Sequence, residues 1–92
     1  MANGIEITLI GKPGCHLCED ARLVLDQVVS EFTDARPAAS VTVTELNIQD
    51  DAALAAKHAE EIPVVLINGQ MHTYWRIDAE RLMTKLKETS DA

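Results

Sequence analysis

The sequence has little positive charge. Its 92 residues include 8 Lys and Arg against 15 Asp and Glu, which gives a net charge of −7. Because nucleic-acid binding relies on Lys and Arg that displace counterions from phosphates, this shortage argues against a nucleic-acid partner. It also disfavours binding to an anionic membrane surface. We interpret the acidity as a contribution to solubility.

Long apolar runs are also missing. No run approaches the roughly 20 residues that a helix needs to span a bilayer. Residues 1–12 lack the basic region and the apolar stretch that are typical of a secretory signal. We therefore expect a protein of the cytoplasm that does not bind membranes. The length fits one compact domain over residues 1–92, which we expect to be a monomer.

Cysteine is scarce, and the two cysteines that occur are close together in the chain, at Cys15 and Cys18. In the cytoplasm thiols are kept reduced, so a structural disulfide is not expected there. A Cys-x-x-Cys motif in that setting predicts redox catalysis or metal binding instead.

The spacing of apolar residues predicts four strands and three helices, in the order β-α-β-α-β-β-α. The predicted strands are residues 5–10, 41–48, 62–67 and 70–75. The predicted helices start at Cys15, at Asp50 or Asp51, and at Asp78. They run to about Arg36-Pro37, through His58, and over Leu82, Met83 and Leu86, and we expect residues 88–92 to be frayed.

The connections between these elements predict an α/β fold. A strand–helix–strand unit should pair its strands in parallel. Asn68-Gly69 favours a type I′ turn, and the hairpin it closes adds an antiparallel edge to a mixed four-stranded sheet. Pro63 can lie only at the start of its strand. In residues 41–48 the alternation slips between Val43 and Leu46, which indicates either a bulge or a strand covered on both faces.

The two cysteines lie where the first strand leads into the first helix. The free backbone N–H groups and the dipole of a helix N-terminus stabilise a thiolate, here at Cys15. Lys12 favours that thiolate, whereas Glu19 and Asp20 oppose it. The spacing brings both sulfurs within reach of a disulfide on one helix face. We therefore expect Cys15 to attack a disulfide sulfur and Cys18 to resolve the mixed disulfide.

Metal binding is the main alternative for this pair. Cys15 and Cys18 would be half of a zinc site that His16, His58 or His72 completes. No second Cys or His cluster occurs in the sequence, so we predict no metal site and no tightly bound cofactor. Two further alternatives stay open: a zinc or iron–sulfur module held between two chains through Cys15, and a non-catalytic adaptor that holds peptides.

Several motifs, in this order, resemble the glutaredoxin-like branch of the thioredoxin superfamily. They are residues 12–18 with the cysteine pair, residues 61–64 with Ile62-Pro63, the Asn68-Gly69 turn and Asp78. The resemblance implies a thioredoxin-like fold with helices on both faces of the sheet, and a thiol–disulfide oxidoreductase activity. The implied substrates are protein disulfides or glutathione mixed disulfides, with glutathione as a candidate co-substrate and glutathione-dependent deglutathionylation as the alternative activity.

The resemblance also implies roles for single residues. Pro63 would be cis and face the cysteines, while the backbone of Ile62 would pair with a bound peptide or glutathione. Lys12 would lie near the glycyl carboxylate of glutathione. The family usually has an aromatic residue between the two cysteines, and here His16 and Leu17 take its place. Because His16 lies between the cysteines, it would favour the thiolate as a cation.

Residues 74–77 replace a Gly-Gly pair that glutaredoxins usually carry before the last helix. The bulky Tyr74 and Trp75 either block the glutathione groove or reshape it, and Arg76 is a candidate for a carboxylate contact. Because side chains alternate along a strand, one of the two aromatic rings should face the core. We expect Trp75 to pack under the last helix.

Overall fold

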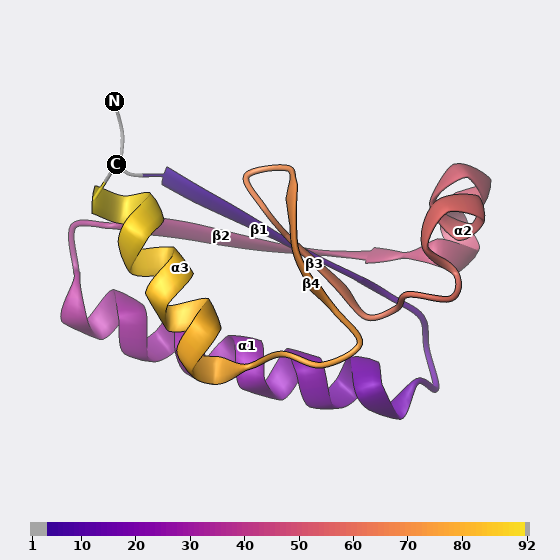
Figure 1. Cartoon of the computed structure of the whole chain (residues 1–92), viewed down its shortest axis with the longest axis horizontal. Coiled ribbons are helices and arrows are strands. Elements are labelled where there is room, and N and C mark those ends of the chain that lie inside the picture. The colour runs from indigo at the N-terminus through magenta and orange to yellow at the C-terminus, as the bar shows by residue number, and fades with distance from the viewer. Residues whose placement is uncertain (1–3, 92) are drawn as a thin grey trace.

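Four strands and three α-helices follow one another in the expected order in this computed structural model, which describes residues 4–91 (Figure 1). The elements are β1 (Gly4–Gly11), α1 (His16–Ala35), β2 (Ser40–Asn47), the 3-10 turn η1 (Ile48–Asp50), α2 (Ala52–His58), β3 (Val64–Ile67), β4 (Gln70–Tyr74) and α3 (Ala79–Asp91).

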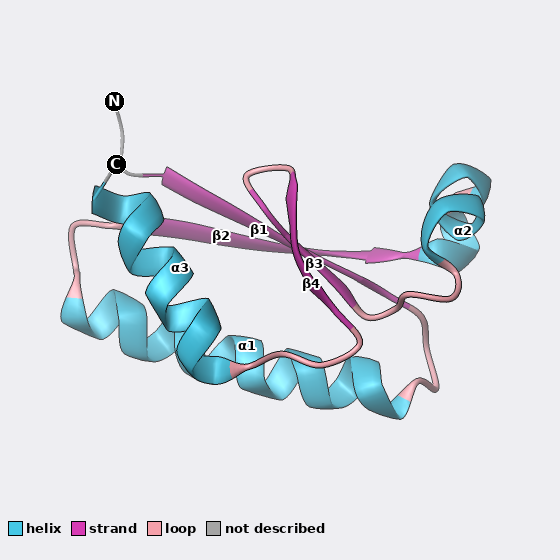
Figure 2. Cartoon of the chain, viewed as in Figure 1, coloured by secondary structure: helices cyan, strands magenta, loops and turns pink. Residues whose placement is uncertain are grey.

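The strands form one mixed sheet in the order β2-β1-β3-β4. β1 pairs in parallel with β2 and antiparallel with β3, and β3 pairs antiparallel with β4. This arrangement confirms the predicted α/β fold, with a parallel strand–helix–strand unit followed by an antiparallel hairpin. Figure 2 shows that the loops from β1 to α1 and from α2 to β3 lie at the same end of the sheet.

The helices cover the two faces of the sheet unequally. Figure 1 shows α1 and α3 together on one face, where they enclose the main apolar core. That core consists of Ile5, Ile7, Leu9, Ala21, Leu25, Val28, Phe32, Val65, Ile67, Leu82 and Leu86. On the other face, the short helix α2 packs Leu54 and Ala55 against a smaller cluster at one end of the sheet, formed by Ile10, Ile48 and Val64.

Local capping signals place the shorter elements as predicted. The Asp51 carboxylate accepts hydrogen bonds from the N–H groups of Ala53 and Leu54 at the start of α2. Asp78 does the same at the start of α3, accepting from Glu80 and Arg81. These carboxylates satisfy N–H groups that have no partner within the helix. In the hairpin, Asn68 and Gly69 both have positive φ, of 51° and 82°, as a type I′ turn requires.

The second strand corrects one prediction. It pairs with β1 without a bulge and its side chains are mostly exposed, so it is neither bulged nor covered on both faces. The apolar residues that interrupt the alternation differ in position, because Val43 and Leu46 are both 38% exposed within β2. Ile48, assigned to the strand from the sequence, lies in the 3-10 turn η1 and is buried there in the smaller apolar cluster.

The C-terminal end corrects another prediction. Helix α3 continues to Asp91, so residues 88–91 are helical instead of frayed, and Ala92 lies outside the described residues. The hydroxyl of Thr89 donates to the carbonyl oxygen of Lys85, and Arg36 donates to the hydroxyl of Ser90. These bonds attach the last turn to the helix and to the end of α1.

Within the part of the chain that the structure describes, no helix combines the length and the apolar composition that crossing a bilayer requires.

Candidate active site

The cysteine pair lies at the junction of β1 and α1. Cys15 is the N-cap of α1, with extended backbone angles (φ −100°, ψ 112°), and Cys18 lies in the first turn. The two residues form a disulfide, and their Cα atoms are 5.2 Å apart. This separation is within the usual range for disulfides, so α1 can hold both sulfurs together without a change in its backbone.

The backbone of α1 supplies a hydrogen bond to the sulfur of Cys15. The N–H of Cys18 donates to Cys15 Sγ over 3.1 Å, and the N–H of Glu19 donates to the Cys15 carbonyl oxygen over 3.0 Å. A hydrogen bond to the charged form of a group lowers its pKa. Together with the helix dipole, the N–H of Cys18 therefore favours a thiolate at Cys15 once the disulfide is reduced.

The sulfur of Cys18 packs against a glycine of β1. Cys18 is only 4% exposed, whereas Cys15 is partly exposed. A Cβ atom on Gly11 would lie 2.8 Å from Cys18 Sγ, closer than real Cβ atoms approach. Only glycine leaves room for the sulfur here. A glycine at a strand end often marks the close approach of another group, and here that group is Cys18 Sγ.

Pro63 lies next to Gly11 on the neighbouring strand. The antiparallel register pairs Ile10 with Val64, and its continuation by one residue places Pro63 across from Gly11. The Ile62–Pro63 bond is cis, as the resemblance implied. Ile62 is partly buried against the cluster formed by Ile10, Ile48 and Val64. Residues from β1, α1 and the start of β3 therefore meet at one end of the sheet.

An aromatic pair borders Pro63 at the end of β4. The N–H of Trp75 donates to the Pro63 carbonyl oxygen over 2.8 Å, and its indole N–H donates to the Glu60 carbonyl oxygen over 3.0 Å. The rings of Tyr74 and Trp75 meet edge to face with centroids 5.0 Å apart. Both are about half exposed, 46% and 53%.

The prediction that Trp75 packs under the last helix is therefore wrong. The φ of Trp75 is +69°, a conformation in which few residues other than glycine occur. Neither ring of the aromatic pair faces the core, because Tyr74 is exposed at the end of β4 and the chain turns away from the strand at Trp75. Strained backbone of this kind occurs most often at functional sites.

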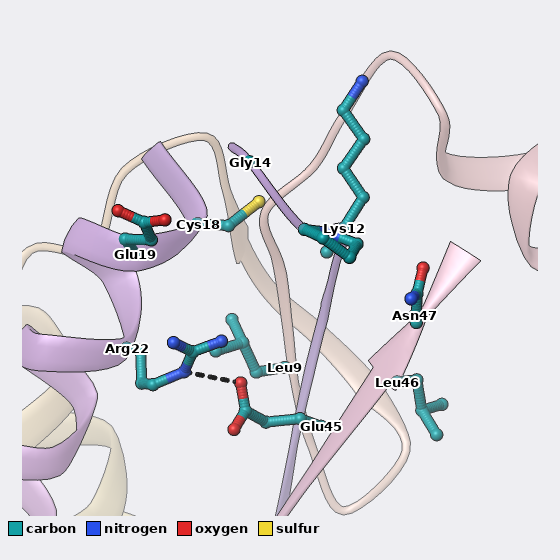
Figure 3. Close-up of a pocket in the computed structure, with 11 residues that line it drawn as sticks. Leu9, Lys12, Gly14, Cys18, Glu19, Arg22, Glu45, Leu46 and Asn47 are labelled. Carbon is teal, nitrogen blue, oxygen red and sulfur yellow. Dashed lines mark hydrogen bonds and ion pairs between the residues drawn. The ribbon is translucent and has the colours of Figure 1, made fainter. Parts of the chain in front are cut away.

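A pocket of about 480 Å³ opens beside Cys18 (Figure 3). It lies between the β1–α1 loop, the first turns of α1 and the end of β2, and its lining includes Lys12, Cys18 and Asn47. Arg22 and Glu45 form an ion pair of 2.7 Å along its lower side. The hydrogen bond and the charge of Glu45 raise the pKa of Arg22 above its usual value.

No local pattern in the sequence indicates the Arg22–Glu45 ion pair. The two residues are far apart in the chain and meet only because β2 lies parallel to β1 beneath the start of α1. Charged residues on two separate amphipathic elements carry no local signal of such a contact.

The remaining predicted residues have different positions relative to the cysteines. Lys12 lines the pocket, and its amine extends away from the Arg22–Glu45 ion pair in Figure 3. His16 is the exposed first residue of α1. Arg76 is exposed and follows the aromatic pair, so the structure places it beside Trp75 and outside the pocket lined by Cys18.

The histidines do not gather around the cysteines. His58 is buried at the end of α2, where its Nδ1 lies 3.1 Å from a carboxylate oxygen of Glu61. His72 is buried in β4. Across residues 4–91, no group of three or more His, Cys, Asp or Glu side chains is arranged to hold a metal ion.

A family model matches most of the chain, including the residues of the site described above. The family model described as "Glutaredoxin-like domain (DUF836)" matches residues 6–87, which include the cysteines, Pro63 and most of α3. The chain belongs to this glutaredoxin-like family.

Relatives and solved structures agree with this assignment. The chain is 26% identical over 85 residues to "Uncharacterized protein Rv0508" of Mycobacterium tuberculosis, covering 92% of this chain and 86% of that protein. It is similar to the X-ray structure of protein XcR50 from X. campestris, with a TM-score of 0.69, 28% identity, and coverage of 89% of this chain and 96% of that one.

The fold is also shared with a thioredoxin. Chloroplastic thioredoxin z matches with a TM-score of 0.73 and 17% identity, over 98% of this chain and 81% of that one. At this identity the likeness shows the fold alone, and it establishes that the glutaredoxin-like chain has a thioredoxin-like architecture. The Cys-x-x-Cys pair in its disulfide state, in this family and fold, indicates a redox function.

Proposed function

We propose that this glutaredoxin-like protein is a thiol–disulfide oxidoreductase that reduces protein disulfides with the Cys15–Cys18 pair. One observation carries the proposal: Cys15 is the N-cap of α1 and its sulfur accepts the N–H of Cys18 over 3.1 Å. This position favours the thiolate, which is the form of cysteine that attacks disulfides. We place the reaction in the cytoplasm, where thiols are kept reduced.

The reaction consists of two exchanges. The Cys15 thiolate attacks one sulfur of the substrate disulfide, which forms a mixed disulfide and releases the other substrate sulfur as a thiolate. Cys18 then loses its proton and attacks Cys15 Sγ, which releases the second substrate thiolate. The substrate gains two electrons and becomes a dithiol, while the protein is oxidised to the Cys15–Cys18 disulfide. An external thiol or dithiol reduces that disulfide in two equivalent exchanges.

The burial of the two sulfurs supports this division of roles. Cys15 is partly exposed and can meet a substrate, whereas Cys18 is 4% exposed and can meet only the neighbouring sulfur. The cis Pro63 follows the partly buried Ile62 and, by continuation of the strand register, neighbours Gly11, against which Cys18 packs. By the family resemblance, the backbone of Ile62 would pair with an extended substrate segment.

Glutathione is the alternative substrate component. Lys12 is an exposed cation beside the cysteines and could pair with a carboxylate, as could the exposed Arg76. Against this alternative, Tyr74 and Trp75 occupy the stretch where glutaredoxins usually carry two glycines. Hydrogen bonds to the carbonyl oxygens of Pro63 and Glu60 hold Trp75 beside Pro63. We therefore favour protein disulfides.

Turnover of a protein disulfide tests the proposal. We expect the wild type to reduce a protein disulfide, Cys15→Ser to have no activity, and Cys18→Ser to stop at a mixed disulfide that mass spectrometry detects. Ala38→Ser, in the exposed loop after α1, introduces the same side chain elsewhere and should retain wild-type activity. Full activity of Cys15→Ser would refute the proposal.

A parallel assay with a glutathione mixed disulfide distinguishes the alternative. Deglutathionylation that survives Cys18→Ser but not Cys15→Ser would identify glutathione as the partner and show that Tyr74 and Trp75 leave the groove open. If only the protein disulfide is reduced, glutathione is not the substrate component, in agreement with the proposal.

A further inference from the structure

The two edges of the sheet differ in how well they are protected from other strands. β4, at one edge, has five residues, and its register with β3 shifts between Val65 and Leu66 at a bulge. It ends at Trp75, whose positive φ turns the chain away. Short length and bulges are devices by which proteins prevent an edge strand from pairing with another chain.

β2, at the opposite edge, has none of these devices. It has eight residues and pairs with β1 in one continuous register, while its other side faces no strand of the described chain. Its sequence is SVTVTELN, with four successive β-branched residues and no Lys or Pro. Such residues favour extended strands, and an exposed, regular edge of this kind pairs readily with another strand.

We propose that β2 pairs antiparallel with β2 of a second copy of this chain, so that two sheets join across a two-fold axis. Residues that pair must point to the same face of the sheet. In a two-fold arrangement this condition allows Val43 to oppose its own equivalent, with Thr42 opposite the second copy's Thr44. Valine then meets valine and threonine meets threonine, and cross-strand pairs of both kinds are stabilising.

This register also fits the charges. Glu45 is the only charged residue of β2, and Arg22 of the same chain holds its carboxylate over 2.7 Å. Val43 on the axis places Glu45 opposite the second copy's Val41, so the two carboxylates are roughly 13 Å apart along the strands. That separation exceeds the screening length of about 8 Å at physiological salt. The two Glu45 carboxylates therefore do not oppose each other in the proposed contact.

The proposal is independent of the redox function and replaces the monomer expected from the sequence. The sequence predicts β2 but does not reveal that it lies at an edge, because strand order depends on contacts between distant residues. The pairing is isologous, since the same strand contributes from both copies. The cysteines take no part in it, because both belong to the disulfide within one chain.

Sedimentation velocity of the oxidised protein, from low micromolar to millimolar concentration, tests the proposal. We expect the wild-type mass to double as concentration rises. Val43→Lys should remain a monomer over the same range, because it places two like charges opposite each other on the axis. Val43 is 38% exposed, so the fold can accommodate the change. Met71→Lys, on β4 and 47% exposed, is the matched control and should still form dimers.

Amide hydrogen exchange locates the contact. Amides of residues 41–45 should gain protection with concentration in the wild type and in Met71→Lys, but not in Val43→Lys. Thr42→Lys, whose exposed side chain lies on the other face of β2, provides a second disruption should Val43→Lys fail to fold. A wild type that stays monomeric at millimolar concentration, or a dimer that survives the β2 substitutions, would overturn the proposal.

Discussion

The apolar core beneath the sheet and the region around the cysteines depend on different properties of their residues. The core holds large side chains such as Phe32 and Leu25, which are fully buried. Their contribution depends on the volume that they fill and not on a special backbone geometry. Around the cysteines, backbone groups and small residues decide the structure: the N–H of Cys18, the absence of a Cβ on Gly11, and the carbonyl of Pro63. Substitutions in the core should therefore act through the buried volume that they remove. Substitutions around the cysteines should act through the position of the backbone and the space beside it.

The largest expected effect is a loss of stability from the core. Phe32→Ala removes a fully buried ring between α1 and the sheet and should cost about 3–5 kcal/mol of unfolding free energy. That loss is a large fraction of the 5–15 kcal/mol typical of a native protein. Urea unfolding measures it. The fraction that remains folded should keep the wild-type reduction potential, and a shifted potential in that fraction would break the distinction between the two regions.

A smaller loss of stability, with a change in redox behaviour, is expected from Gly11→Ala. The added methyl would lie 2.8 Å from Cys18 Sγ and must displace it, which should cost roughly 1–3 kcal/mol. A free thiol can rotate away more easily than a bridged sulfur, so the disulfide should become easier to reduce. Equilibration with a thiol redox buffer measures this shift.

Gly4→Ala is the matched control for that substitution. Gly4 begins the same strand, and a Cβ there meets no atom within 4 Å. Its reduction potential should equal that of the wild type. Equal potentials for Gly4→Ala and Gly11→Ala, both different from wild type, would mean that the strand as a whole, and not the contact with Cys18, sets the potential.

The smallest expected effect is on the pH dependence of stability, and it comes from the buried His72. Burial, followed by the charges of Arg81 and Lys85, lowers the pKa of His72, and its Nε2 has no hydrogen-bond partner. Because the folded protein binds the proton less readily than the unfolded chain, this histidine favours folding above its unfolded pKa of about 6.5. The contribution is lost as pH falls from there through the lowered pKa of the folded state.

Unfolding at pH 7.5 and pH 5.5 should therefore show less pH dependence in His72→Gln than in the wild type. His16→Gln, at an exposed position, serves as the control and should follow the wild type. A pH dependence that is unchanged in His72→Gln would contradict the role given to burial of His72.

Features with a local signal could be predicted from the sequence. The carboxylates of Asp51 and Asp78 cap helices that begin one residue later, and Asn68-Gly69 adopts the turn that its residue types favour. The placement of Cys15 at the start of α1 follows from the same reasoning, because Gly14 and Pro13 end the strand before a helical period begins. These features depend on residues within one or two turns of each other.

Features without a local signal could not be predicted. The extra residue of the β4 bulge and the left-handed backbone of Trp75 depend on how β4 meets β3 and on the bond from the indole to Glu60. The contact of Gly11 with Cys18 and the Arg22–Glu45 ion pair require the packing of α1 over β1 and β2. The cis bond before Pro63 was implied by the family resemblance, since the residues themselves favour trans.

The pKa of the Cys15 thiol in reduced Cys18→Ser protein tests the central claim most directly. The substitution leaves the N–H of residue 18 in place and removes the only other thiol. The rate of alkylation as a function of pH reports the thiolate. The N-cap position and the hydrogen bond predict a pKa below the value of about 8.5 for free cysteine. A pKa at or above that value would contradict the account of Cys15 as the activated nucleophile.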